Sequence, residues 1–154
     1  MKEKTPYSVV RMLPDDPLFA AYCRLRIALW PDCAEDGEAD LPEGAAFLAL
    51  TAAGEPVGLI EMSLRSYAEG ACDSPVPFIE GWFVESNYRR QGIGRALVNA
   101  AEQWAAARGF REIGSDTELG NTVSIEAHER LGYREVERNV CFLKQLNQPS
   151  GPHH

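Results

Sequence analysis

The segment from Tyr88 to Leu97 has the residue types and spacing best suited to chemistry. It reads Tyr-Arg-Arg-Gln-Gly-Ile-Gly-Arg-Ala-Leu, follows an apolar segment and opens a long amphipathic one. In a succession of strand, glycine loop and helix, the first amides of the helix have no carbonyl partners, and the positive end of the helix dipole lies beside them. The segment therefore predicts a site for a phosphate or pyrophosphate group.

Two well-known phosphate loops do not fit this segment. A Walker loop requires Lys and then Ser or Thr after its last glycine, whereas Arg95 and Ala96 follow Gly94. A dinucleotide fingerprint requires a third glycine where this chain has Leu97. Two interpretations remain open: a coenzyme loop of another kind, and a glycine turn that starts an ordinary surface helix.

Two carboxylates are candidates for acid–base work. Glu80 stands among apolar residues in the segment 78–84, and Asp116 stands at the end of the next predicted strand. A buried carboxylate needs a partner, a raised pKa or an opening to a site, because an unpaired charge is costly to bury. If the two carboxylates meet at neighbouring strand ends, they can hold an ammonium group, and their repulsion is expected to raise one pKa. The alternative is a Glu80 that is paired with an arginine.

A second polar set lies on one face of the predicted helix 121–131. Asn121, Ser124 and His128 are spaced by three and four residues, which places them on the same side of a helix. Asn121 is first of all a helix cap and only secondarily a ligand. His128 is either a solvated surface histidine or a functional group.

The apolar periodicity predicts a single α/β domain over residues 5–146 with a mixed sheet, followed by a disordered or non-native tail at 147–154. The expected helices run from about 17 to Trp30, from 93 to about 108 and from 121 to 131. The expected strands are 7–13, 45–51, 56–67, 75–85, 112–117 and a last one within 135–146. Strands 75–85 and 112–117 flank a helix, so a right-handed crossover makes them parallel and directs a ligand to their carboxyl ends.

Composition limits the classes of partner. The chain has 154 residues, 45% apolar and 25% charged, with a net charge of -8, which argues against nucleic acid. No apolar run is long enough for a membrane span and no secretory signal is visible, so we expect a cytoplasmic protein without membrane contact. The four cysteines lack metal-ligand spacing and are expected to be free thiols, with no bound metal. Six acidic residues and no basic one lie between Asp32 and Glu43, either as a rim that attracts a polycation or as a solvated loop.

From residue 78 to residue 146 the chain resembles the GCN5-related N-acetyltransferase family. The resemblance rests on Arg89-x-x-Gly92-x-Gly94 and on the segment from Asn121 to Tyr133, which is similar to the family motif Asn…Ala-hydrophobe-Tyr-Glu-Lys-Leu-Gly-Phe. It implies the single-domain fold of that family: a mostly antiparallel sheet whose central parallel pair splays around acetyl-coenzyme A, with helices on both sides. Many members have a tyrosine that protonates the departing thiolate, and this chain has His128 there.

A narrower resemblance covers nearly the whole chain. Leu29-Trp30-Pro31, Ser66-Tyr67, Phe78-x-Glu80-Gly81 and Ser115-Asp116-Thr117 are similar to the dimeric, chromosomally encoded aminoglycoside 6′-N-acetyltransferases. This resemblance implies acetyl transfer to the 6′-amino group of an aminoglycoside, antibiotic resistance and a homodimer. Two alternatives are a different amine acceptor, such as a polyamine, a peptide N-terminus or a small metabolite, and a coenzyme A-binding regulatory domain without turnover.

The resemblance also implies roles for individual residues in a direct transfer within a ternary complex. Glu80 would take the ammonium proton, Asp116 would orient the amine, and His128 would protonate the thiolate. Trp30 and Tyr67 would line the acceptor site with the two carboxylates, and the amide of Val84 would polarise the thioester oxygen. The full set implied for coenzyme binding is Phe83, Val84, Arg89, Arg90, Gln91, Gly92, Ile93, Gly94, Arg95 and Asn121.

Overall fold

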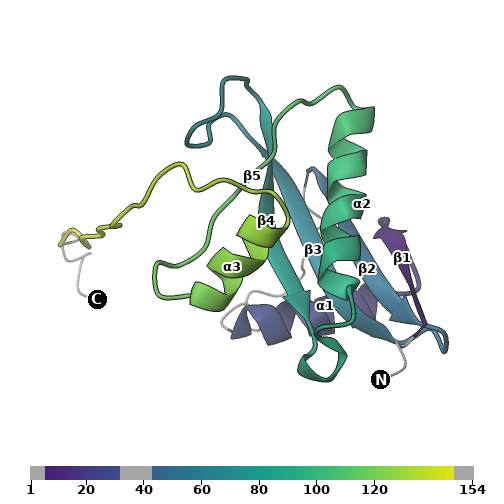
Figure 1. Cartoon of the computed structure of the whole chain (residues 1–154). Coiled ribbons are helices and arrows are strands. Elements are labelled where there is room, and N and C mark those ends of the chain that lie inside the picture. The colour runs from purple at the N-terminus through teal and green to yellow at the C-terminus, as the bar shows by residue number, and fades with distance from the viewer. Residues whose placement is uncertain (1–5, 32–42, 148–154) are drawn as a thin grey trace, which may run out of the picture.

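The computed structural model describes residues 6–31 and 43–147. The elements follow one another as β1 (Tyr7–Met12), α1 (Phe19–Leu29), β2 (Ala45–Thr51), β3 (Pro56–Arg65), β4 (Val76–Val84), the short 3₁₀ helix η2 (Ser86–Tyr88), α2 (Ile93–Ala107), β5 (Gly114–Ser115) and α3 (Thr122–Arg130). Figure 1 shows α2 in front of the strands and α1 behind them. The expected α/β architecture is confirmed, and the segment 32–42, which holds most of the acidic run, lies outside the described residues.

The described strands form one sheet in the order β1-β2-β3-β4-β5. Its first four strands are antiparallel neighbours, and β4 pairs with β5 in parallel. The path from β4 through α2 to β5 is the predicted crossover, because parallel neighbours must be joined by a connection that crosses the sheet. The parallel pair lies at the edge of the described sheet rather than at its centre.

Side chains of β2 alternate between the two faces of the sheet. Ala46 and Leu48 pack with Tyr22 and Leu25 of α1 in one core cluster, whereas Phe47 packs under α2 in the other. Successive residues of a strand point to opposite faces, so one apolar strand supplies both cores. Each large side chain buried in this way stabilises the fold by about 1.5–3 kcal/mol.

Helix α1 begins and ends where local chemistry requires it. The carboxylate of Asp16 accepts a hydrogen bond from the amide of Leu18 at 2.9 Å, which satisfies a backbone donor just before the first turn. The helix ends at Leu29, and Pro31 follows, which has no amide hydrogen with which to continue a helix. Trp30 is thereby fixed at the end of α1, beside the sheet.

Helix α2 packs its apolar face directly on β3. Ile93, Leu97, Ala101 and Trp104 are buried along that face, with the spacing of an amphipathic helix. A side chain at Gly58 of β3 would begin only 3.0 Å from a methyl carbon of Leu97. This close packing anchors the first turn of α2, which follows the glycine loop.

Two predicted strands differ from the structure. The strand expected at 112–117 is limited to Gly114–Ser115, because the chain diverges from β4 after its two paired residues. The final strand expected within 135–146 is wrong for this chain: residues 134–147 contain no helix or strand. A strand requires a neighbouring edge to pair with, and no other described segment of the chain pairs with this one. Figure 1 shows the segment running away from the body of the molecule.

Candidate active site

The glycine loop presents backbone amides at the start of α2. Gly92 adopts the left-handed region with a φ of 85°, which a glycine reaches without the steric cost that a β-carbon imposes. The first helical hydrogen bond runs from the amide of Ala96 to the carbonyl of Gly92 at 3.0 Å. The amides of residues 93–95 therefore have no i−4 carbonyl partner in the helix, as an anion site requires.

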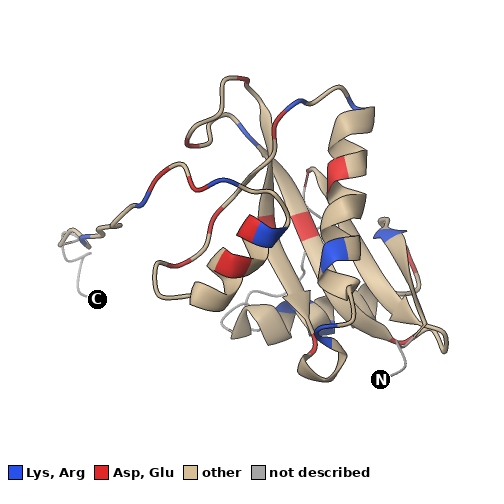
Figure 2. Cartoon of the chain, in the orientation of Figure 1, with Lys and Arg blue, Asp and Glu red and all other residues tan. Residues whose placement is uncertain are grey.

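Side chains from two strands hold this loop in place. Tyr7 of β1 donates its hydroxyl to the carbonyl of Gly92 at 3.2 Å, and the indole of Trp82 donates to the carbonyl of Gly94 at 3.1 Å. Arg89 folds back so that its Nε donates to the carbonyl of Val84 at 2.8 Å. Figure 2 shows basic residues around this end of α2. The loop is thus braced by bonds that leave its helical amides facing outward.

Strands β4 and β5 separate beyond their first pairs. Only Phe78 and Ile79 pair with β5, opposite Gly114 and Ser115, although β4 continues to Val84. The amide of Glu85 bonds to β3, so by the alternation of a strand the amide of Val84 points away from β3, toward the side that β5 has left. Between Glu80 and Val84, therefore, β4 makes no ladder bonds to β5, and an opening lies between the two strands.

Glu80 is the extra residue of a β-bulge. Met62 pairs with Ile79 and the next residue of β3, Glu61, pairs with Gly81, so Glu80 faces no residue of β3. Bulges redirect side chains and occur often beside active sites. The carboxylate accepts two hydrogen bonds from Arg65, at 2.7 and 2.8 Å, and one from the hydroxyl of Ser63 at 2.5 Å.

These bonds determine the charge state of Glu80. The Arg65 guanidinium lowers the pKa of the Glu80 carboxyl below its usual range, the Ser63 hydroxyl lowers it further, and partial burial opposes both. The expected increase in pKa from a second carboxylate is therefore not what the structure gives. The expected alternative, a Glu80 paired with an arginine, is present, and the carboxylate is ionised at neutral pH.

Asp116 lies near the same arginine. Arg65 packs over the ring of Phe78, with 3.6 Å between its guanidinium carbon and the ring centroid. A β-carbon at Gly114 would lie 2.8 Å from that ring, and Asp116 follows Gly114 by two residues. Negative charges on Glu80 and Asp116 both raise the pKa of Arg65. Both predicted carboxylates thus act electrostatically on one guanidinium, and Glu80 is bonded to it.

His128 is bonded through both ring nitrogens. Its Nδ1 lies 2.7 Å from the carbonyl oxygen of Ser124, so Nδ1 carries the proton and donates it. Its Nε2 lies 2.8 Å from the hydroxyl of Ser115 on β5 and accepts from that hydroxyl in the neutral ring. The ring also meets Trp82 and Tyr133 edge to face. His128 is therefore a half-buried link between α3 and β5 rather than a solvated surface histidine.

Trp30 is positioned by a buried charged cluster. Arg26 pairs with Glu61 at 2.5 Å, and Glu61 is only 3% exposed and also accepts from the hydroxyl of Tyr22. The guanidinium of Arg26 packs over the Trp30 ring at 5.3 Å. A side chain at Gly81 would begin 2.5 Å from the same ring, so the indole rests on the backbone next to Glu80.

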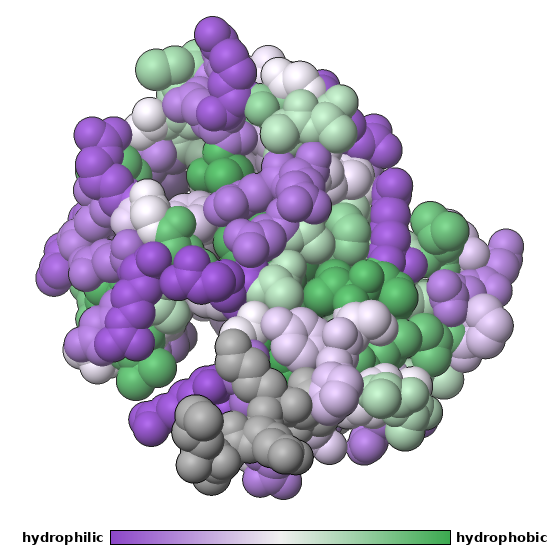
Figure 3. All heavy atoms as spheres, turned by 45° about the vertical axis from the view of Figure 1, so that its right-hand side comes forward, coloured by the Kyte–Doolittle hydropathy of each residue, from purple (hydrophilic) through white to green (hydrophobic). Residues whose placement is uncertain are grey.

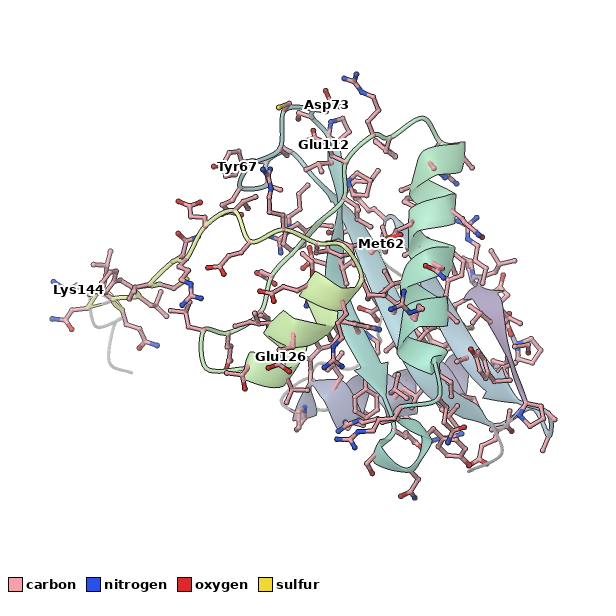
Figure 4. The ribbon with its side chains drawn as sticks, viewed as in Figure 1. Met62, Tyr67, Asp73, Glu112, Glu126 and Lys144 are labelled. Atoms are coloured by element: carbon pink, nitrogen blue, oxygen red, sulfur yellow. The ribbon has the colours of Figure 1, made fainter. Side chains whose placement is uncertain are left out.

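The remaining predicted residues are placed less closely around Glu80. The Asn121 side chain accepts from the amide of Ser124 at 3.1 Å, which confirms it as the cap of α3. Tyr67 is 68% exposed and lies on the loop after β3, at the end of the sheet near Asp73 and Glu112 (Figure 4). Of the expected coenzyme residues, Ile93 is buried and offers only its backbone, whereas Arg90 and Arg95 are exposed.

A separate groove lies on the other side of α2. It has a volume of 610 Å³ and is lined by Val9, Arg11, Phe47, Ala96, Asn99, Ala100, Gln103 and Trp104. Figure 3 shows an apolar surface on this side of the molecule. The groove contains none of the residues predicted for catalysis. It therefore forms no part of the candidate active site.

Three further features of the described residues bear on the site. Cys23, Cys72 and Cys141 are free thiols, and no group of metal-binding side chains is assembled within residues 6–31 and 43–147. None of the helices in those ranges is both long and apolar enough to cross a bilayer. The candidate site is thus made of backbone amides, carboxylates, arginine, histidine and tryptophan.

Sequence reasoning missed four polar residues of the site. Ser63 and Arg65 contact Glu80 only because of the β3–β4 register, which a single sequence does not reveal. Ser115 was seen only as a neighbour of Asp116. Glu61, however, stands among apolar strand residues just as Glu80 does, and the same argument applied to it would have predicted a buried partner.

Comparison with known proteins agrees with this geometry. The acetyltransferase (GNAT) family profile matches residues 15–133, so the chain belongs to the GNAT acetyltransferase family. The family prediction made from the loop and from the Asn121–Tyr133 segment is thus confirmed.

The relatives narrow the comparison. The chain is 42% identical over 138 residues to an aminoglycoside N(6')-acetyltransferase type 1 of Stenotrophomonas maltophilia, with 85% of this chain and 89% of the relative covered. It is 40% identical over 137 residues to the protein of that name from Klebsiella aerogenes, covering 82% and 90%. A solved structure of AAC(6')-Iy, in complex with the bisubstrate analog CoA-S-monomethyl-acetylneamine, matches with a TM-score of 0.80 and 32% identity over 91% of this chain and 99% of that one.

Proposed function

We propose that this chain transfers the acetyl group of acetyl-coenzyme A to the 6′-amino group of aminoglycosides and so confers resistance to them. The observation that carries the proposal is the bulged Glu80, bonded to Arg65 at the point where β4 and β5 separate. Relatives that are 40% and 42% identical to this chain are named aminoglycoside N(6')-acetyltransferases. An amine-binding carboxylate beside a coenzyme opening is what that reaction needs.

The coenzyme half of the proposed site is built from backbone. The outward amides of residues 93–95, with the exposed guanidiniums of Arg90 and Arg95, suit a pyrophosphate. The opening between β4 and β5 suits a narrow, uncharged pantetheine arm, because backbone groups left without a strand partner can bond to its amides. Bound there, acetyl-coenzyme A supplies a thioester.

The acceptor half is built from side chains. Glu80 takes a proton from the substrate ammonium, directly or through a water, and Asp116 orients the amine. The ring of Trp30 offers a flat apolar wall against Gly81, and Tyr67 extends the wall on the exposed loop after β3. A polycation matches this arrangement, since two carboxylates face one resident arginine.

Chemistry then follows from positions rather than from a covalent enzyme intermediate. The deprotonated amine nitrogen forms a bond to the thioester carbonyl carbon, the bond from that carbon to sulfur breaks, and the nitrogen releases a second proton, which balances the proton that the thiolate takes up. The Val84 amide, which points into the opening, stabilises the negative oxygen; one such donor contributes roughly 3 kcal/mol. His128 in its protonated form returns a proton to the departing thiolate, directly or across the Ser115 hydroxyl.

We further propose that the protein acts as a homodimer. The segment 134–147 exposes large apolar side chains: Val140 is 71% exposed, Phe142 92%, Leu143 92% and Leu146 78%. The outer edge of β5 is unpaired among the described strands. A second copy that received this segment along that edge would cover both features.

A cytoplasmic location is proposed from the free thiols, which reducing compartments preserve.

Thiol release from acetyl-coenzyme A tests the proposed activity. We expect turnover with kanamycin and tobramycin, formation of the 6′-N-acetyl product by mass spectrometry, and a higher inhibitory concentration in a drug-sensitive host that expresses the chain. Turnover with spermidine or a peptide, and none with aminoglycosides, would show that the acceptor is a different amine. Coenzyme binding without any turnover would favour a regulatory domain.

The dimer is tested by light scattering on the intact chain. We expect twice the chain mass for the wild type and a monomer for the double variant Phe142→Asp/Leu143→Asp. Val123→Asp is the matched control, because Val123 is 77% exposed on α3, outside the segment 134–147. A monomeric wild type would refute the dimer and leave the acetyltransferase proposal in place.

A further inference from the structure

Arg65 occupies the position on Glu80 that a substrate ammonium needs. Its Nε and Nη2 each bond to one carboxylate oxygen, at 2.7 and 2.8 Å, a two-pronged pairing that fixes the carboxylate plane. Phe78 lies beneath the guanidinium at 3.6 Å. The Arg65 side chain is nevertheless 40% exposed and that of Glu80 31%, so both are open to an incoming amine.

The charges around this pair leave room for one cation. Glu80 and Asp116 supply two negative charges, Arg65 supplies one positive charge, and Glu69 on the loop after β3 contributes a further negative field at Arg65. Ser63 is neutral and donates to Glu80. Between the two predicted amine-binding carboxylates, therefore, the net charge is one negative unit rather than two.

We propose that Arg65 is a positioning residue that holds Glu80 oriented until the amine arrives and then yields one carboxylate oxygen to it, moving toward Asp116. The inference rests on the proposed acetyl transfer and names how its acceptor site is set. The bidentate pair keeps Glu80 turned toward the opening, and the exchange of partners replaces one cation by another without uncovering a charge. No bond other than hydrogen bonds is made or broken.

Two consequences follow for the acceptor. Arg65 competes with the ammonium for Glu80, so it weakens the binding of every amine. When the guanidinium moves to Asp116, the negative field of Glu69 remains for a second ammonium group of the acceptor.

The test compares Arg65→Met and Arg65→Lys with the wild type, using tobramycin and a monoamine such as benzylamine over a range of pH. For Arg65→Met we expect the KM for tobramycin to fall about threefold, because the amine no longer competes with a partly exposed guanidinium for Glu80. We expect kcat to fall about tenfold, because misplacing a proton acceptor is costly. The acid limb of kcat/KM, which reports ionisation of Glu80, should move to higher pH, because the guanidinium no longer lowers the Glu80 pKa. Arg65→Lys, which keeps the charge without the fork, should lie between the two.

Arg108→Met is the matched control, since Arg108 is exposed at the far end of α2 and packs on Trp104; it should change none of these values. An acid limb that stays in place in a folded Arg65→Met variant overturns the proposal, as does a raised KM for tobramycin. Thermal melting identifies a misfolded variant, for which Arg65→Lys supplies the same readouts. A wild type inactive on aminoglycosides would instead refute the proposed function.

Discussion

The two halves of the site are built in different ways. The coenzyme half consists of backbone amides at the start of a helix whose buried face is packed on β3. The acceptor half consists of side chains that hold one another by ion pairs: Arg65 with Glu80, and Arg26 with Glu61 next to Trp30. Backbone groups can vary little without loss of the fold, whereas side-chain contacts can be exchanged. The proposed site thus combines a donor half fixed by the fold with an acceptor half whose contacts can be exchanged.

The largest effect is expected from Glu80→Gln. Removing the proton acceptor should lower kcat/KM about 10³-fold, within the range for general bases. The fold should persist, because the neutral amide still bonds to Ser63 and Arg65. Steady-state thiol release with tobramycin measures the first effect and thermal melting the second.

Glu61→Gln is the contrasting variant. Glu61 is buried with Arg26 and Tyr22, and loss of one buried partner destabilises by about 3 kcal/mol. We expect a clear fall in melting temperature and a much smaller kinetic change than for Glu80→Gln. Equal turnover of Glu80→Gln and the wild type would end the catalytic assignment.

His128→Ala should have the next largest effect. It removes the proposed proton donor and should lower kcat about a hundredfold, at the low end for a positioned acid. Turnover equal to that of the wild type at every pH would reduce His128 to its bonds with Ser115 and Ser124.

A pair of glycine variants separates the two halves. Gly92→Ala places a side chain at a φ of 85°, which costs about 1–2 kcal/mol and should raise the KM for acetyl-coenzyme A about tenfold. Gly81→Ala presses on the Trp30 ring and should raise only the KM for the aminoglycoside. If both variants changed both KM values equally, the division into a donor half and an acceptor half would be wrong.

The smallest effect concerns stability and pH. The Glu80 pKa is lowered by Arg65, so the pair stabilises the fold above the unfolded-state pKa of about 4.3, and this contribution is lost as the pH falls through the lower folded-state value. Because both groups are about one third exposed, the contribution should be less than about 1 kcal/mol. The melting-temperature difference between the wild type and Glu80→Gln should therefore shrink below about pH 4. A difference that grew in acid would contradict the assigned pair.

Local patterns predicted the glycine loop and α2 well and the contacts around Glu80 only in part. Gly92, Gly94 and the apolar spacing from Ile93 to Trp104 lie within one stretch, so the loop and α2 could be predicted from neighbouring residues. Contacts such as Arg65 with Glu80 depend on strand register, which one shifted residue changes. The prediction for the segment 134–147 failed for a related reason: its alternating apolar residues are typical of a strand, but no described strand pairs with it.

The bulge at Glu80 makes β4 one residue longer than its pairing with β3 requires. Ile79 and Gly81 pair with consecutive residues of β3, and beyond them Trp82 reaches α2 while Phe83 packs with the α1 cluster. Omitting Glu80 would join Ile79 to Gly81 and leave every other side chain of β4 on its present face. The proposed proton acceptor is therefore a single-residue insertion into a strand that is complete without it. A chain lacking Glu80 should fold as an ordinary GNAT sheet and bind coenzyme, yet transfer nothing.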